Sequence, residues 1–163
     1  MEQMLEDMEL LEDTQRDKYL TFILGKEEYG IGIGYVTEIV GIQSITEVPE
    51  LPHYVKGIIN LRGKIIPVID VRLRFGKEPI EYTDRNCTIV IEVKDLTVGL
   101  IVDTVAEVLS ISQENIVPLP KLSGSSDHKY IKGIGKSGNN VKLLLDCDKL
   151  FSDEEVECLS NIK

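Results

Sequence analysis

Few residues in this chain have the types and spacing that catalysis requires. Cys87 is a conceivable nucleophile if one of the two histidines, His53 or His128, lies beside it, but each histidine stands next to turn residues. Cys87 also begins an apolar run that predicts a strand, where a cysteine usually acts as a small hydrophobic residue. A cysteine enzyme therefore stays an alternative, and a protein without catalysis is the main hypothesis.

Other chemistries lack their residue patterns. Gly30, Gly32 and Gly34 alternate with apolar residues as in a strand, and not as in a phosphate-binding loop. Asp70 and Asp146 each follow a predicted strand, where capping of the next helical turn explains them. The three cysteines are odd in number and have no CxxC spacing, so the sequence predicts neither a zinc site nor a disulfide framework, and indicates a reducing, cytoplasmic location. We expect no metal and no cofactor.

The segment Asn60-Leu-Arg-Gly63 carries residues that are suited to recognition. Asn60 and Gly63 are expected to bracket a tight turn, from which Arg62 would present a planar fork of five donors to a carboxylate. Glu38 is a plausible partner within the chain. The pair would then fix the turn, or serve as a binding hot spot, or do both, because a held arginine is pre-organised for a partner. In the apolar run that follows, Pro67 indicates a strand edge or a bulge.

An internal repeat predicts the elements that position this segment. Val36, Glu38 and Pro49 return at one constant spacing as Val105, Glu107 and Pro118, and Tyr54-Val-Lys-Gly-Ile returns as Tyr130-Ile-Lys-Gly-Ile at a wider spacing. The change of spacing indicates an insertion in the polar stretch 121–129. A repeat of this length predicts one small fold used twice about a pseudo-twofold axis.

Short β-branched runs separated by glycine, proline and charged turns predict a mainly β protein of two small barrels. Matching hairpin turns are expected at Lys26-Glu27 and Lys94-Asp95, and a polar connection between the repeats at 77–85. Helix is limited to a short turn at 70–75 and a C-terminal helix within 152–163, which a Ser152–Glu155 capping box opens. The expected strands are Tyr19–Leu24, Glu28–Val36, Ile39–Ile45, Ile65–Ile69, Thr88–Val93, Leu96–Val102, Glu107–Ile111 and Val141–Leu145.

The charge distribution indicates a protein partner. The 163 residues carry a net charge of −10, much of it in an acidic, flexible tail at 1–17, whose Met and Leu residues fall at helical spacing. An amphipathic docking helix is the alternative for this tail. The stretch 56–77 is locally basic. Its positive charge is too small for binding nucleic acid, but it suits a partner protein with an acidic patch. No apolar run reaches the length of a membrane span, and no secretory signal is present.

The motif from Gly57 to Arg72, GIINLRGKIIPVIDVR, resembles the signature of the CheW family, and the resemblance extends from about Tyr19 to Leu159. That family comprises the bacterial chemotaxis coupling proteins and the regulatory domain of the histidine kinase CheA. It implies a CheW-like domain at 18–151, made of two intertwined five-stranded SH3-like barrels, with lobes at about 19–85 and 86–151. It also implies a non-enzymatic adaptor that joins the cytoplasmic tip of a methyl-accepting chemoreceptor to CheA at membrane-bound receptor clusters.

Carried over by position, the family resemblance implies two binding surfaces and no direct insertion into the membrane. The kinase-binding candidates are Ile39, Ile42 and Ile45 on apolar strand faces. The second repeat has Gly135-Lys-Ser-Gly138 in place of the Asn-Leu-Arg-Gly turn, so we expect an asymmetric site. A kinase-regulatory module, or a small-ligand sensor that uses the groove between the lobes, stays open as an alternative. The residues expected to line or shape that groove for a receptor helix hairpin are Val36, Glu38, Gly57, Asn60, Leu61 and Arg62.

Overall fold

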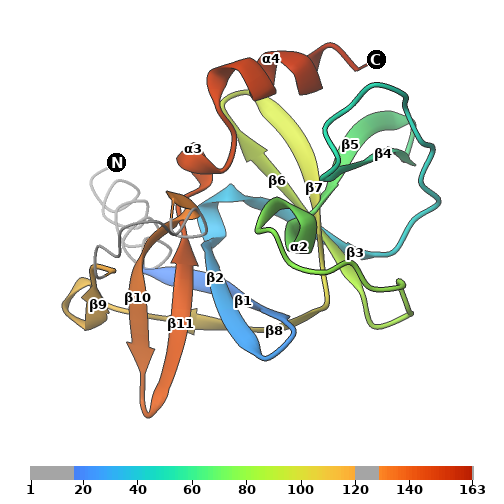
Figure 1. The fold of residues 1–163 in the computed structure, drawn as a ribbon. Helices are drawn as coiled ribbons and strands as arrows, with labels where there is room; N and C mark the ends of the chain where they lie inside the picture. Colours follow the sequence, from blue (N-terminus) through green and yellow to red (C-terminus); the bar gives the residue numbers. More distant parts are fainter. Residues whose placement is uncertain (1–16, 120–128, 163) are drawn as a thin grey trace, which may run out of the picture.

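The computed structural model describes residues 17–119 and 129–162, which form two β-sheets with short helices between and beside them (Figure 1). The expected acidic tail falls mostly on residues 1–16 and the expected insertion on 120–128, and both lie outside the described residues. The mainly β class with two lobes is confirmed.

A six-stranded sheet forms one lobe. Its order is β8, β1, β2, β11, β10, β9, and neighbouring strands are antiparallel except for the parallel pair β2 and β11. The strands are β1 (Lys18–Leu24), β2 (Glu27–Gly32), β8 (Thr104–Ser110), β9 (Ile116–Val117), β10 (Ile131–Ser137) and β11 (Asn140–Leu145).

A five-stranded sheet forms the other lobe. Its order is β3, β6, β7, β5, β4, and here β5 and β7 are the parallel pair. The strands are β3 (Val36–Gly41), β4 (Val55–Leu61), β5 (Lys64–Asp70), β6 (Cys87–Val93) and β7 (Leu96–Val102).

The two repeats exchange strands, so the sheets do not divide near residue 85 as the expected lobe boundaries did. Strands β1 and β2 come from the first repeat but pair with β8 and β11 of the second. In return, β6 and β7 of the second repeat pair with β3 and β5 of the first. This exchange occurs because the chain changes sheets after the second strand of each repeat. The lobes are therefore intertwined.

Two of the expected strands have different bounds in the structure, where the chain changes sheets. Glu28–Val36 is not continuous, because β2 ends at Gly32 and a 3₁₀ turn, η1 (Ile33–Tyr35), leads into β3. Strand β3 begins at Val36 and ends at Gly41, so the expected strand Ile39–Ile45 is displaced toward the N-terminus. The first hairpin turn lies at Gly25-Lys26, one residue before its expected place, while Lys94-Asp95 is the second turn as expected.

The short helices begin at capping residues that the sequence indicated. Helix α2 (Val71–Arg74) has Asp70 as its N-cap, and α3 (Cys147–Leu150) has Asp146 at the equivalent position. Both aspartates accept hydrogen bonds from backbone N–H groups of the following turn. Helix α4 (Asp153–Ser160) begins with the predicted capping box, and a second 3₁₀ turn, η2 (Gln113–Asn115), precedes β9.

One continuous core joins the lobes. Phe22 and Tyr29 from the six-stranded lobe stack with ring centroids 5.6 Å apart, Tyr29 lies 5.4 Å from Phe75, and Phe75 lies 5.6 Å from Tyr130. These aromatic residues belong to a buried cluster that takes residues from both sheets. Because burial of a large apolar side chain contributes about 1.5–3 kcal/mol, this shared core favours a fixed arrangement of the two lobes.

Candidate functional site

The turn between β4 and β5 presents Arg62 to solvent. Arg62 and Gly63 have positive φ values of 52° and 87°, as a two-residue turn of type I′ requires. The Asn60 side-chain oxygen accepts a hydrogen bond from the N–H of Gly63 at 2.8 Å, so these residues bracket the turn as expected. The Arg62 side chain is 71% exposed.

Arg62 forms the expected ion pair with Glu38, whose side chain is 29% exposed. The pair joins the β4–β5 turn to β3. Strands β3 and β4 lie at opposite ends of the sheet order. The hydrogen bond to Glu38 raises the pKa of Arg62. A pair in contact with solvent contributes little to stability, so its main structural effect is to orient the guanidinium.

Gly57 is required by a close approach inside the protein. Its φ is +147°, and a Cβ atom there would lie 2.2 Å from the carbonyl oxygen of Thr46. Thr46 and Ile58 exchange two backbone hydrogen bonds of 2.9 Å, which hold this segment against β4. A larger residue at position 57 would therefore disturb β4 itself.

The apolar candidates are divided between core and surface. Ile39 on β3 is 43% exposed. Ile42, Ile45 and Leu61 are half-buried and pack on a small cluster in the five-stranded lobe, and Val36 is half-buried against the large core. All nine candidates thus lie in the five-stranded lobe or in the segment after β3, and Ile39 is the apolar one most open to a partner.

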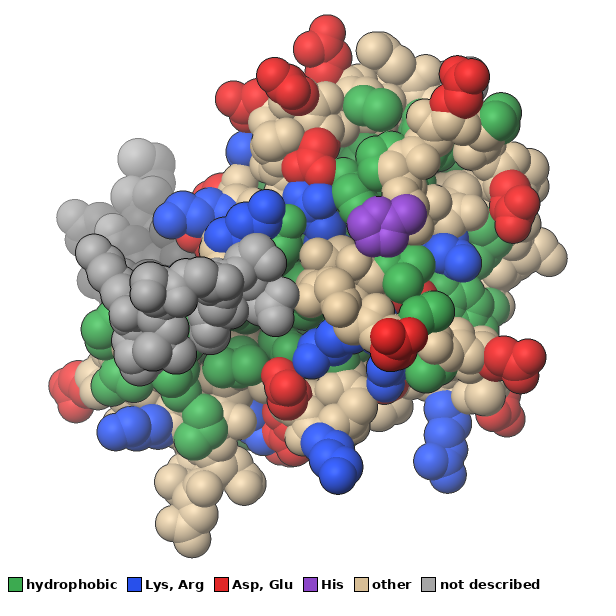
Figure 2. Space-filling view, viewed as in Figure 1, with side chains coloured by type: hydrophobic (Ala, Val, Ile, Leu, Met, Phe, Trp, Pro, Cys, Tyr) green, Lys and Arg blue, Asp and Glu red, His purple; other side chains and the backbone are tan. Residues whose placement is uncertain are grey.

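The basic stretch 56–77 does not form a continuous basic surface, because tertiary partners neutralise most of its charges. Arg72 pairs with Asp103, Arg74 with Glu155 and Lys77 with Glu27, at 2.5, 2.7 and 3.3 Å. Figure 2 shows the resulting mixture of basic and acidic side chains over one face. These acidic partners are distant in sequence, so no local pattern could have revealed them.

The cysteines lie in different environments. Cys87 is half-buried at the start of β6, and its thiol donates to the carbonyl oxygen of Arg85 at 3.6 Å. Burial raises the pKa of Cys147 to about 12, and Cys158 is exposed on α4. Among the described residues, no group of three or more His, Cys, Asp or Glu could hold a metal ion, and no helix has the length and apolarity to cross a membrane.

A family model for the CheW-like domain matches residues 18–155. The chain belongs to the CheW family. The chemotaxis protein CheW of Klebsiella aerogenes is 37% identical over 92% of this chain and 90% of its own length. The protein of the same name from Treponema pallidum is also 37% identical, over 88% of this chain and 86% of its own length.

A solved structure of the same family has the same fold. It is the scaffolding protein TtCheW of Thermoanaerobacter tengcongensis, which is 39% identical. It aligns with a TM-score of 0.77 over 84% of this chain and 93% of its own. The CheW family that the motif at Gly57–Arg72 indicated is therefore confirmed.

Proposed function

We propose that this protein is a non-enzymatic chemotaxis scaffold that joins the cytoplasmic tip of a chemoreceptor to the regulatory domain of the kinase CheA. The observation that carries the proposal is a CheW-like domain that occupies residues 18–155. The relatives that span nearly the same length are named chemotaxis protein CheW, and the related structure is named a scaffolding protein. Such a scaffold works in the cytoplasm and is recruited to membrane-bound receptor clusters by its partners.

The receptor contact is proposed around the β4–β5 turn. Arg62 is exposed, its turn is held by Asn60, and Glu38 orients its guanidinium. A guanidinium has five donors in a planar fork, so Arg62 can bind Glu38 and still donate to a carboxylate or to the carbonyl end of a partner helix. Leu61 packs on the small cluster and Val36 on the large core, and Gly57 allows the close approach of Thr46 to β4. A pre-organised arginine of this kind is typical of a binding hot spot.

The kinase contact is proposed on the outer side of β3. Ile39 is 43% exposed on a strand at the end of the sheet order, where a partner can reach it. Ile42 and Ile45 continue from this strand and anchor its end on the small cluster. An exposed apolar residue on an edge strand suits a partner sheet or hydrophobic groove.

Replacement of Arg62 by Ala tests the receptor contact. We expect Arg62→Ala to weaken binding of a purified receptor cytoplasmic fragment at least about ten-fold, as for a hot spot, while binding of the CheA regulatory domain stays unchanged. Isothermal titration with each partner measures both affinities. Arg85→Ala is the matched control, because Arg85 is also exposed but lies in the connection before β6. Receptor affinity equal to that of the unaltered protein would exclude Arg62 as a hot spot.

Failure of the unaltered chain to bind either partner would contradict the scaffold role itself. Circular dichroism and thermal unfolding of each variant show whether a loss of binding comes from a loss of fold. Binding to both partners, with loss of the receptor alone in Arg62→Ala, is the expected result.

A further inference from the structure

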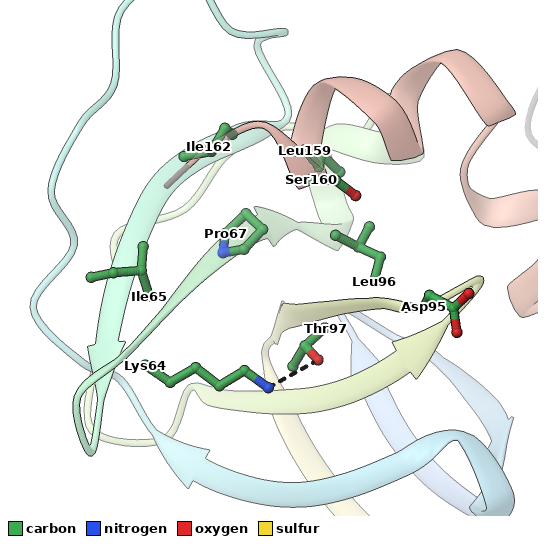
Figure 3. A pocket seen from close by; sticks show the side chains of 9 residues that line it. All are labelled: Lys64, Ile65, Pro67, Asp95, Leu96, Thr97, Leu159, Ser160 and Ile162. Carbon is green, nitrogen blue, oxygen red and sulfur yellow. Dashed lines mark hydrogen bonds between the residues drawn. The ribbon is translucent and has the colours of Figure 1, made fainter.

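Two cavities meet the side chain of Leu159 on α4. The first has a volume of about 210 Å³ and lies between β5 and β7, where Lys64 donates to the Thr97 hydroxyl oxygen across it (Figure 3). It is lined by charges of both signs, from Lys64 and Asp95, so it favours neither an acidic nor a basic partner. The second cavity indicates a partner more sharply, because the charged residues that line it have one sign.

The second cavity lies between α4 and the segment that leads into β4. Its volume is about 130 Å³, and its lining is apolar apart from two glutamates. Apolar cavities of about 150 Å³ can hold a group as large as benzene, so this one has room for a single apolar side chain. The lining residues are Pro52, Tyr54, Glu154, Glu155, Cys158 and Leu159.

The two glutamates of the lining differ in what they bind. The Glu155 carboxylate accepts from Arg74 at 2.7 Å and from the Ser152 N–H at 2.9 Å, and it also accepts from the Tyr54 hydroxyl. These bonds hold one wall of the cavity in place. Glu154 is exposed, and its carboxylate forms no ion pair among the described residues. Glu154 is therefore the carboxylate at this cavity that is available to an incoming cation.

The surface beside this cavity is acidic. The segments 47–54 and 152–162, which border it, contain no lysine and no arginine. Within the described part of the chain, the carboxylates of Asp153 and Glu155 form ion pairs with cations from other segments. In Figure 2 acidic side chains predominate at the top of the molecule, where Figure 1 places α4. The carboxylates of these segments that have no ion pair among the described residues are those of Glu47, Glu50, Glu154 and Glu157.

This charge distribution excludes several occupants. The N-terminal stretch 1–16 is itself acidic, so it would meet like charge. A second copy of the chain offers little positive charge, because most cations of the basic stretch 56–77 are paired within the protein. Nucleic acids and anionic membrane surfaces are repelled for the same electrostatic reason. A basic segment of another protein is the occupant that suits both the apolar cavity and its acidic border.

We propose that the cavity beside Tyr54 binds a segment of another protein in which an apolar side chain stands next to lysine or arginine. The apolar side chain enters the cavity against Tyr54 and Leu159, and the neighbouring cation pairs with Glu154. The exposed carboxylates of Glu50 and Glu157 add an attraction that salt weakens, because such charges are screened over about 10 Å at 0.1 M ionic strength. The inference does not depend on the proposed function, since none of the receptor or kinase candidates lines this cavity.

A capped peptide of sequence GRLRKG tests the proposal. Two control peptides are matched to it: GRSRKG lacks the apolar side chain, and GELEEG has the opposite charge. Backbone amide resonances of the ¹⁵N-labelled full chain are followed by nuclear magnetic resonance during titration with each peptide. With GRLRKG we expect saturable shifts at His53, Glu154 and Cys158, a dissociation constant in the millimolar range and weaker binding at higher salt. Absence of shifts, or equal affinity for either control peptide, would overturn the proposal.

Two variants locate the contact. Glu154→Lys is expected to weaken GRLRKG binding at least about ten-fold, because it places like charges together. Glu114→Lys changes the net charge equally at an exposed position on η2, so it is the matched control and should bind nearly as the unaltered chain does. Cys158→Phe fills the cavity from the exposed side of α4 and should remove binding, while circular dichroism shows an unchanged fold. Unaltered binding in Glu154→Lys or Cys158→Phe, or an equal loss in Glu114→Lys, would contradict the proposed site.

Discussion

At the scale of single residues, the candidate receptor site depends on backbone conformations that few residues adopt. Arg62 is a non-glycine residue with φ at 52°, and Gly57 has φ at +147°. Each conformation is stabilised by nearby hydrogen bonds: the Gly63 N–H donates to the Asn60 side-chain oxygen in the turn, and Thr46 and Ile58 exchange two backbone bonds beside Gly57. The backbone of the site is thus held by bonds within the protein before any partner binds.

Gly57→Ala is expected to destabilise the protein by about 2–4 kcal/mol. A Cβ atom would lie 2.2 Å from the Thr46 carbonyl oxygen, at a φ that side-chain-bearing residues rarely adopt. Urea unfolding measures the free-energy change. Gly34→Ala is the matched control, since a Cβ atom there meets nothing within 4 Å, and it should change stability by no more than about 0.5 kcal/mol. Equal stability of the two variants would contradict this account of Gly57.

At the scale of elements, α4 is attached to the core by a polar cluster around Arg74. The Arg74 guanidinium stacks on the rings of Tyr54 and Tyr130 at 4.2 and 4.8 Å. It donates to the Leu150 carbonyl oxygen and to Glu155, which also accepts from the Tyr54 hydroxyl. These contacts join α2, the residue that precedes β4 and both C-terminal helices. Residues from both repeats therefore determine where α4 lies over the five-stranded lobe.

Glu155 should make the stability of the protein depend on pH in acid. Burial alone would raise the pKa of Glu155, but hydrogen bonds from Arg74, the Ser152 N–H and Tyr54 lower it from 4.5 to about 2. Because the folded pKa lies below the unfolded one, the stabilisation is full above pH 4.5 and is lost as the pH falls toward 2. We expect about 1 kcal/mol at pH 7, after allowing for solvent screening of this partly exposed carboxylate.

Urea unfolding of Glu155→Gln at several pH values checks this prediction. The variant should be less stable than the unaltered chain at pH 7, and the difference should shrink between pH 4.5 and 2. Glu154→Gln, the exposed neighbour on the same helix, should follow the unaltered chain throughout. A stability difference that stays constant across this range would contradict the ionic role of Glu155.

At the scale of the whole molecule, an ion pair at the crossing point holds the two lobes together. Asp103 lies between β7 of one sheet and β8 of the other, and its carboxylate accepts from the N–H of Gly25 at 2.7 Å. The Arg72 guanidinium of α2 binds both oxygens of Asp103, at 2.7 and 2.5 Å. Burial alone would raise the pKa of Asp103, but the bonds from Arg72 and Gly25 lower it. This charged junction adds to the shared core in fixing the orientation of the lobes.

Arg72→Ala is expected to reduce the free energy of unfolding by about 2–3 kcal/mol, since it leaves a largely buried carboxylate without its cation. Arg72→Lys should restore less than half of the loss, because an ammonium cannot bind both oxygens in the same plane. Thermal and urea unfolding provide the measurement. Lys77→Ala, whose partner Glu27 is exposed, should cost no more than about 0.5 kcal/mol. Full rescue by lysine would show that charge alone matters at this junction.

The sequence by itself determined the β class, the caps of the helices and the Arg62 turn, because each depends on residues close in the chain, and it determined the repeat, because the two copies can be compared directly. Asp70, Asp146 and the Ser152–Glu155 box could be read as caps for that reason. The sequence also offered Glu38 as a plausible partner of Arg62, and the structure forms this pair across 24 positions of the chain.

Only the tertiary structure decided which strands share a sheet, because the exchange between repeats pairs segments far apart in sequence. The same long-range packing determined that Gly57 faces Thr46 and that most cations of the basic stretch are neutralised. It also left β5 and β7 unpaired at one end, where Lys64 meets Thr97. Such features depend on distances between elements, which local propensity and hydrophobic periodicity do not encode.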